Sequence, residues 1–409
     1  MAVLLDTRGR ITRMVDPSMG TWDYEYNVLD RLKLQTDAKD QDTTYAYDKL
    51  GRLTSLVAED MTSTFTYDTA TNGVGKLKEM STSQGNKRIH SYDSLGRPSQ
   101  TRLTIDSGNY DYLYSYNSDG RLNTVEYPSG YEVRYEYTST QRYLKYLKED
   151  SSGNTLWTAN SRNAAGQYTQ AAMNLSNGYT IDRTYDVYGR ITGVEAGASN
   201  AIADLTFTYD TLGNLTQRQD LNQSVTETFS FDAMNRMTDA TIGSTTRSVT
   251  YNDVGNILSK TELGSSNVNT YNYPSPGNAH PYSVSSIYGS VNGVHYPSFV
   301  YDDNGNMTSG AGRSVTWTAF NRVTSITEGS LSVSFVYDAE HQRIKQSDGS
   351  TVTRFLNDPV AGLQSEYITS DGGTYNDYLF ADGERVGVRT KKTSPSSMNR
   401  PGFTGGSNS

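Results

Sequence analysis

The chain of 409 residues contains no cysteine, which excludes disulfides, thiolate zinc sites and cysteine nucleophiles. No apolar run approaches the ~20 residues that a membrane-spanning helix needs. The first 14 residues hold no apolar segment followed by a cleavage site, so no signal peptide is visible. No Gly-x-Ser-x-Gly or phosphate-loop sequence occurs. The four histidines, His90, His280, His295 and His341, have no metal-ligand spacing and are interpreted as turn or surface residues.

Hydrophobic residues are also scarce, at 34% of the chain, and the mean hydropathy is -0.66. Such values are typical of disorder. The 32 tyrosines favour a folded chain instead, because tyrosine buries a large ring and is enriched in strands. The net charge is -9 with acids and bases interspersed, which argues against a nucleic-acid partner because no basic stripe is present.

A short repeat, Tyr-Asp-x-x-Gly-Arg followed by an apolar residue, runs along almost the whole chain. One copy starts at Tyr47 and ends at Arg52, with Leu53 after it. The usual step of about 20 to 24 residues indicates a repeat architecture with one shared core. Other copies begin at Tyr92, Tyr116, Tyr185, Tyr209, Phe231, Tyr251, Tyr301 and Tyr337, and weaker ones at Leu5, Tyr26, Tyr67, Tyr137, Trp317 and Phe380.

Each repeat is predicted to form a β-hairpin. Residues 44–47 alternate as a strand does, and residues 48–51 read as a turn. The aspartate carboxylate can accept from backbone N–H groups two or three residues on, and glycine suits the left-handed position that closes a type I turn into a bulge. Asn235 and Asn321 replace this glycine, which supports the turn. The predicted fold class is all-β, with repeated antiparallel β-hairpins forming a long curved strip.

The arginine that often follows the glycine has three open interpretations: it reaches the turn aspartate, stacks on a tyrosine of the adjacent hairpin, or is simply solvated. We predict no catalytic, cofactor-binding or metal-binding residue, because one carboxylate per turn is what a turn needs, whereas an acid–base pair would occur once. The residues predicted to form structural turns are Tyr47, Asp48, Gly51, Arg52, Tyr92, Asp93, Gly96, Arg97, Tyr185, Asp186, Gly189, Arg190, Tyr209, Asp210, Gly213, Tyr301, Asp302 and Gly305.

The predicted organisation is a β-strip over residues 1–390 and a disordered tail over residues 391–409. Residues 261–299 interrupt the strip as an irregular proline-rich insertion with a short strand near residues 283–288. The three tryptophans, Trp22, Trp157 and Trp317, occupy strand positions and are predicted to be core residues, with sugar stacking as the alternative.

The repeat resembles the Rhs, or YD-repeat, family over residues 1–390. The resemblance is most specific in Tyr301-Asp-Asp-Asn-Gly-Asn-Met-Thr-Ser-Gly310 and in residues 315–322 and 335–346, and residues 355–359 and 377–383 are also similar. The resemblance implies a β-strip wound into a hollow shell. In bacterial members and insecticidal toxin complexes this shell encloses a toxic C-terminal domain, and in teneurins it serves adhesion. The family's plug, autoproteolytic site and toxin have no counterpart in residues 391–409.

The number of repeats limits what the strip can enclose. About sixteen hairpins give roughly 32 strands and a sheet about 150 Å long, which closes a circle of about 50 Å only once. One circuit is expected not to seal a container and to leave edges and tyrosine-rich faces uncovered. We therefore predict that the chain forms a homo-oligomer or filament, or associates with the remainder of an Rhs shell. The chain is expected to be a fragment or one part of a larger assembly.

The leading hypothesis is a structural, non-catalytic Rhs shell segment of a bacterial exported protein, secreted or at the cell surface. The alternative is a cell-surface adhesin or glycan-binding module. A third hypothesis, an aspartyl self-protease, would need the C-terminal segment of the family. No cofactor, nucleic acid or membrane span is predicted.

Overall fold

The computed structural model describes residues 1–174, 178–261 and 270–393. No α-helix occurs among these residues, and short 3-10 turns lie at Ala198–Asn200 (η1) and Ser370–Gly372 (η3). Nearly all other regular structure is antiparallel β-strand, in one sheet of 24 strands and one of 10. The prediction of an all-β fold of repeated hairpins is confirmed.

The first sheet holds β1 (Ala2–Leu5), β2 (Ile11–Asp16), β3 (Gly20–Tyr26), β4 (Leu32–Thr36), β5 (Asp42–Tyr47), β6 (Leu53–Val57), β7 (Thr62–Tyr67), β8 (Leu77–Thr82), β9 (Lys87–Tyr92), β10 (Pro98–Ile105), β11 (Gly108–Tyr116), β12 (Leu122–Glu126), β13 (Glu132–Tyr137), β14 (Leu144–Glu149), β15 (Thr155–Arg162), β16 (Tyr168–Met173), β17 (Tyr179–Tyr185), β18 (Ile191–Ala196), β19 (Ala203–Tyr209), β20 (Leu215–Asp220), β21 (Val225–Phe231), β22 (Met237–Ile242), β23 (Thr245–Tyr251) and β24 (Ile257–Lys260). The second holds β29 (Phe299–Tyr301), β30 (Met307–Gly310), β31 (Arg313–Trp317), β32 (Val323–Glu328), β33 (Leu331–Tyr337), β34 (Arg343–Ser347), β35 (Val352–Phe355), β36 (Gln364–Ile368), β37 (Thr374–Ala381) and β38 (Glu384–Lys392).

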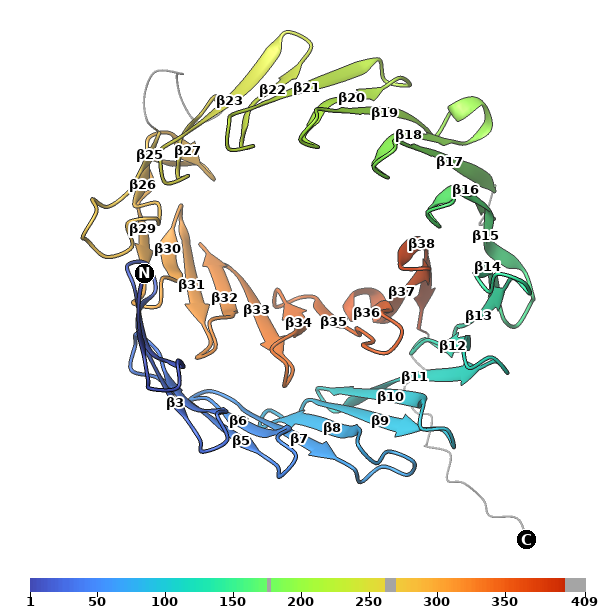
Figure 1. The fold of residues 1–409 in the computed structure, drawn as a ribbon, viewed down its shortest axis with the longest axis horizontal. Helices are drawn as coiled ribbons and strands as arrows, with labels where there is room; N and C mark the ends of the chain where they lie inside the picture. Colours follow the sequence, from blue (N-terminus) through green and yellow to red (C-terminus); the bar gives the residue numbers. More distant parts are fainter. Residues whose placement is uncertain (175–177, 262–269, 394–409) are drawn as a thin grey trace. The chain divides into compact units, whose positions relative to one another are not determined.

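Strands that follow one another in the chain pair as hairpins, as the successive arrows of Figure 1 show for β17 and β18. In the hairpin of β5 and β6, Tyr45 lies opposite Leu56 and Ala46 opposite Ser55. The register then shifts, so that Tyr47 lies opposite Leu53. This shift is the bulge that the turn sequence predicts, because the glycine closes a tight turn by adding one residue to one strand.

The predicted insertion contains four very short strands among its described residues: β25 (Tyr271–Asn272), β26 (Ser286–Ile287), β27 (Ser290–Val291) and β28 (Val294–His295). β26 lies within the strand predicted near residues 283–288, while residues 262–269 fall outside the described part. At the other boundary, β38 runs to Lys392, two residues into the predicted tail, and residues 394–409 fall outside the described part. The predicted division of the chain into strip, insertion and tail stays a prediction.

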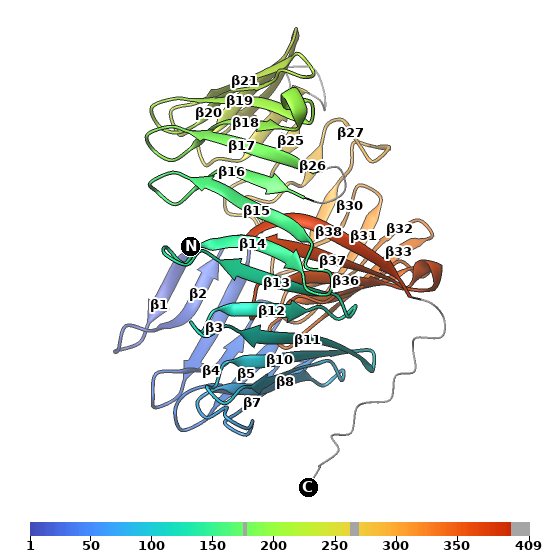
Figure 2. The same ribbon diagram turned by 90° about the vertical axis from the view of Figure 1, so that its right-hand side faces the viewer.

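The chain forms two compact units, each built from segments far apart in the sequence. Unit 1 comprises Met1–Thr62 and Arg134–Leu331, and unit 2 comprises Ser63–Val133 and the chain from Ser332 onward. In unit 2, strands β8–β12 form one layer and β34–β38 another (Figures 1 and 2). The hydroxyl of Tyr112 in the first layer donates to the carbonyl of Leu356 beside the second at 2.6 Å, and both residues are fully buried. The core of unit 2 therefore lies between these two layers.

Candidate functional site

The repeat turn has the same hydrogen-bonded geometry wherever the full sequence occurs. At Asp48, the carbonyl accepts from the Gly51 N–H at 3.0 Å, and one carboxylate oxygen accepts from the Arg52 N–H at 2.9 Å. The other carboxylate oxygen accepts from Arg52 Nε at 2.7 Å. Gly51 has φ +87°, the left-handed region that glycine adopts without strain. The carboxylate thus bonds the amide four residues on, and in other repeats it also accepts from the amide two residues on, as predicted, for example from Leu95 N–H to Asp93 at 2.9 Å.

The other predicted turn residues occupy equivalent places. The aspartate contacts the side chain four residues on in the pairs Asp93–Arg97 (2.7 Å), Asp186–Arg190 (2.6 Å), Asp210–Asn214 (2.9 Å) and Asp302–Asn306 (3.2 Å). The glycines Gly96, Gly189, Gly213 and Gly305 all have positive φ. Asn235, Asn321 and His341 take the glycine position with φ between 58° and 61°. These residues therefore form a regular series of turns, in which histidine also occupies the glycine position.

In several repeats a tyrosine ties the hairpin to the preceding one. The Tyr116 hydroxyl donates to the carbonyl of Pro98, the residue after the preceding Arg97, at 2.8 Å. The Arg97 guanidinium lies 4.4 Å from the centre of the Tyr116 ring while it also bonds Asp93. The same ring-to-carbonyl bond joins Tyr26 to Ile11, Tyr92 to Leu77, Tyr185 to Tyr168, Tyr209 to Ile191, Tyr251 to Met237, Tyr273 to Ile257 and Tyr301 to Val284.

We call this arrangement the tyrosine lock: a repeat tyrosine whose hydroxyl bonds a carbonyl at the start of the preceding repeat's second strand. Arg97 and Arg190 satisfy two of the predicted interpretations at once, since each reaches its aspartate and covers the next tyrosine. The hydroxyl-to-carbonyl bond was not predicted. Its sequence signal is the preference for tyrosine over phenylalanine at the first repeat position, with Phe231 as an exception.

The electrostatics of the turns favour the charged form of the aspartates. The Arg10 side chain, followed by its backbone N–H, lowers the pKa of Asp6 to about 2. At Asp232 the backbone N–H of Arg236 is the main cause of a lowered pKa. At Asp210 the Asn214 side chain is the main cause of a lowered pKa. A general acid or base needs a pKa near neutrality, so these carboxylates are suited to holding turns.

Unit 2 contains a buried ion pair between its layers. Arg88 of β9 contacts Asp338 at 2.7 Å and Glu340 at 2.8 Å. Asp338 is the turn aspartate of the repeat that begins at Tyr337, and its carboxylate also accepts from the N–H groups of Glu340 and Gln342, both at 2.9 Å. Burial raises the pKa of Asp338, and Arg88 acts in the opposite direction. The pair joins a strand of one layer to a turn of the other.

Further buried polar groups lie in the same interlayer region. The Tyr114 hydroxyl donates to the Asp358 carboxylate at 2.5 Å, and burial raises the pKa of Asp358. Burial lowers the pKa of His90 to about 4, with Arg88 contributing in the same direction, and its Nδ1 lies 3.2 Å from Thr101 Oγ1. An uncharged imidazole beside a neutral hydroxyl is consistent with a packing role.

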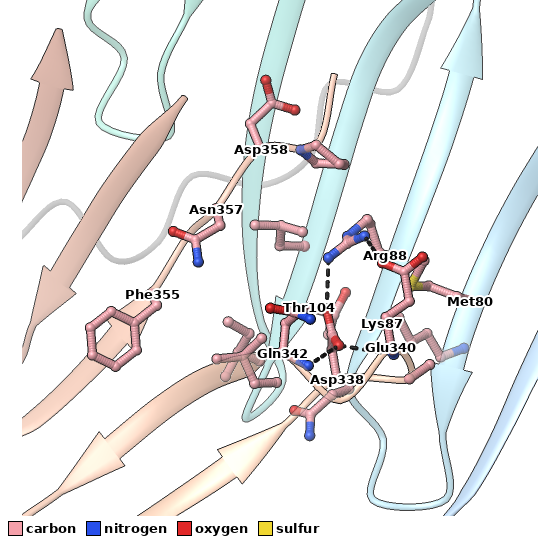
Figure 3. A pocket seen from close by; sticks show the side chains of 16 residues that line it. Met80, Lys87, Arg88, Thr104, Asp338, Glu340, Gln342, Phe355, Asn357 and Asp358 are labelled. Carbon is pink, nitrogen blue, oxygen red and sulfur yellow. Dashed lines mark hydrogen bonds and ion pairs between the residues drawn. The ribbon is translucent and has the colours of Figure 1, made fainter. Parts of the chain in front are cut away.

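A cavity of about 190 Å³ opens beside the buried ion pair (Figure 3). Arg88, Asp338 and Glu340 lie on one side in the view of Figure 3, and Phe355 and Asn357 on the other. Much of the lining is apolar, namely Met80, Leu103, Ile105, Ala339, Ile344 and Pro359. The sequence contained no signal for this cavity, because its residues come from four separate segments of the chain.

Comparison with known proteins agrees with this repeat geometry. Residues 167–358 match the family model described as Teneurin YD-shell. The chain is therefore similar to the YD-repeat shell family over just under half of its length. The resemblance found in the sequence is therefore confirmed. Among curated proteins, no sequence match was found.

Several solved structures share the fold over nearly the whole chain. The crystal structure of TcdB2-TccC3 matches 96% of this chain with a TM-score of 0.73 and 14% identity. TcdB2-TccC3 without its hypervariable C-terminal region also matches 96%, at 0.72 and 15%. The Photorhabdus luminescens Tc holotoxin pore matches 96%, at 0.72 and 14%. The chain spans 22% to 23% of the length of those chains. Likeness at this identity establishes the fold alone.

The remaining candidate residues of the chain lie apart from one another. His280 Nδ1 lies 2.7 Å from the Ser18 carbonyl, and His295 is exposed. Trp22 and Trp157 are buried, as predicted, and Trp317 is half-buried with its Nε1 donating to the Met307 carbonyl at 2.9 Å. Within the described ranges, no cluster of three metal-ligating side chains occurs. Nor does that part of the chain contain a helix long and apolar enough to cross a membrane.

Proposed function

We propose that this chain is a structural, non-catalytic segment of a YD-repeat shell in an exported bacterial protein, and that it associates with further YD-repeat segments, including copies of itself, to encase a polypeptide toxin. The fold it shares with TcdB2-TccC3 and with the Tc holotoxin pore supports this role. Because the chain spans 23% of the TcdB2-TccC3 chain that it matches, a casing of comparable size needs additional repeats.

The observation that carries the proposal is a row of exposed apolar side chains at the fourth position of successive repeats in unit 1. Tyr188, Leu212, Met234 and Val254 form this apolar turn row, with exposed fractions from 65% to 80%. Repeats of two strands place consecutive members about 10 Å apart. Four large apolar side chains at regular spacing on exposed turns are typical of an interaction surface.

Unit 1 also contains an example of such turns packing together. Asn304 holds the fourth position of the repeat at Tyr301, and its Nδ2 donates to the buried Asp37 carboxylate at 2.6 Å. Asn304 Oδ1 accepts from the Ala38 N–H at 3.0 Å. The fourth turn position therefore already contacts the turn of another repeat where two parts of unit 1 meet. The apolar turn row offers the same position to a second chain.

The test is the association state of the purified chain, measured by sedimentation equilibrium. The double variant Leu212→Glu with Met234→Glu introduces charges into the row and is expected to weaken self-association by about tenfold or more. Thr211→Glu with Ala233→Glu places the same charges at the third positions of the same turns and serves as the matched control. A monomer at all concentrations, or equal effects of both pairs, would contradict association through this row.

The absence of catalysis is tested separately by intact mass. After prolonged incubation the mass of the chain is expected to be unchanged, and a discrete cleavage product would overturn the non-catalytic assignment. This result does not depend on whether the chain associates.

A second candidate function, glycan binding at a cell surface, is favoured by one observation. Tyr288 and Tyr296 are exposed and lie side by side, with ring centres 4.7 Å apart and ring planes tilted by 34°. Exposed aromatic rings offer apolar faces on which a sugar can stack. A glycan array on which Tyr288→Ala binds as the unaltered chain does, or on which neither binds, would rule out this site.

A further inference from the structure

The cavity of unit 2 has the size of a single amino-acid side chain. Its volume of about 190 Å³ lies below the ~300–1,000 Å³ of pockets for drug-sized ligands. It exceeds the roughly 150 Å³ of an apolar cavity that takes up benzene. A benzyl or isobutyl group therefore fits, and a multi-ring ligand does not.

The lining is suited to an apolar group. Met80, Leu103 and Ile344 are buried aliphatic side chains on three different strands. Phe355 also lines the cavity. The guanidinium of Arg343 covers one side of the Phe355 ring, at 4.7 Å from the ring centre. Transfer of an apolar group from water to such surroundings is favourable in proportion to the area buried.

The polar groups are suited to a peptide backbone. Arg88 is 8% exposed, and two of its nitrogens are occupied by Asp338 and Glu340. Its Nε is buried and has no hydrogen-bond acceptor within the described part of the chain. This nitrogen is shielded from solvent, so the hydrogen-bonding groups open to an incoming peptide lie on other side chains. Asn357 and Gln342 are exposed amides in the lining and can bond peptide groups.

We propose that this cavity binds one phenylalanine- or leucine-sized side chain of a partner polypeptide, with neighbouring backbone groups bonding the exposed amides of Asn357 and Gln342. Binding of this kind anchors an extended polypeptide to unit 2 through a single residue. The proposal concerns unit 2 alone and does not rest on the shell function.

The test uses N-acetyl-phenylalanine amide as the probe and the Met80 methyl group as the reporter. Met80 lines the cavity and is 2% exposed, and its signal in a 13C-methyl-methionine spectrum can be assigned with Met80→Leu. We expect a saturable shift of the Met80 signal, with no change at Met173, which is buried in unit 1. N-acetyl-alanine amide, which lacks the large side chain, is expected to shift neither signal.

Two variants change the cavity in opposite directions. Ala339→Phe fills the cavity and is expected to weaken binding of the probe by about tenfold. Ala233→Phe, at the equivalent but exposed position of another Asp-Ala turn, is expected to leave binding unchanged. Leu103→Ala enlarges the cavity and is expected to admit N-acetyl-tryptophan amide, which the unaltered chain excludes. An absent Met80 shift, equal effects of the two alanine variants, or a larger shift with toluene than with the peptide amide would overturn the proposal.

Discussion

Strands β17–β24 of unit 1 and β8–β12 of unit 2 carry the same turn and the same tyrosine lock, yet they are buried to different extents. Among residues 178–261, Ala196 is the only buried residue. Strands β10 and β11, by contrast, bury Leu103, Ile105 and Tyr112 against the layer of β34–β38. The lock is therefore a local device that does not itself create a core. We infer that a second layer supplies most of the stability, because apolar burial is the dominant favourable term in folding.

The largest expected effect comes from the buried ion pair. Arg88→Met leaves the buried Asp338 carboxylate without its partner, which is expected to reduce the free energy of unfolding of unit 2 by about 3–5 kcal/mol. The matched control is Arg102→Met in the neighbouring strand, where the pair with Asp111 is partly exposed to solvent and a loss of about 1 kcal/mol or less is expected. Urea unfolding of both variants gives the comparison. Similar losses would mean that the interlayer pair contributes no more to the free energy of unfolding than the Arg102–Asp111 pair does.

The pH dependence of unit 2 is expected to contain a contribution from His90. The pKa is about 4 in the folded protein and 6.5 as the ordinary value, so between these values the unfolded chain binds more protons. The contribution of neutral His90 to the free energy of unfolding is fully present above pH 6.5. It is lost as the pH falls through 4, which lowers the free energy of unfolding by about 3 kcal/mol. The raised pKa of Asp338 and of Asp358 acts in the opposite direction, adding stability as the pH falls.

The His90 contribution is isolated by unfolding the unaltered chain and His90→Gln in urea at pH 7 and at pH 4. The acid loss of stability is expected to be smaller in His90→Gln, since the aspartate contributions are common to both proteins. An identical pH dependence of the two proteins would show that the pKa of His90 is the same in the folded and the unfolded chain.

Removing one hydroxyl in each region compares the two directly. Tyr114→Phe leaves the buried Asp358 carboxylate without its 2.5 Å bond and is expected to cost about 2 kcal/mol. Tyr209→Phe removes the lock to Ile191, in a half-buried setting where water can replace the bond, and is expected to cost about 0.5–1 kcal/mol. Thermal unfolding gives both values, and a larger loss for Tyr209→Phe would reverse the proposed ranking.

The smallest effects are expected at the turn glycines. Gly213 has φ +92°, so Gly213→Ala is strained and is expected to cost about 1 kcal/mol. Gly213→Asn is expected to cost less, because Asn235 adopts φ +58° at the equivalent place in the next repeat. Differential scanning calorimetry measures the difference in stability between these two variants. Equal losses would show that the left-handed conformation is not what selects these residues.

The hairpin and its turn could be predicted from the sequence because they depend on contacts within one repeat. Asp48, Gly51 and Arg52 bond one another across five residues, which a single copy of the repeat encodes. The interlayer contacts are different in kind. Asp338 occupies the same repeat position as Asp48, yet it is buried because Arg88, 250 residues earlier in the chain, packs against it. Nothing within the Tyr337 repeat marks that burial, so neither the ion pair nor the cavity could be predicted.

The most direct test of the role assigned to the second layer is hydrogen exchange of the intact chain followed by mass spectrometry. Slow exchange is expected in peptides from β9–β11 and β36–β37, where both layers are buried, and faster exchange in peptides from β19–β23, although both regions have equivalent backbone hydrogen bonds. Equal protection of the two regions, or slower exchange in β19–β23, would contradict the account and would assign the stability of the strip to the tyrosine locks themselves.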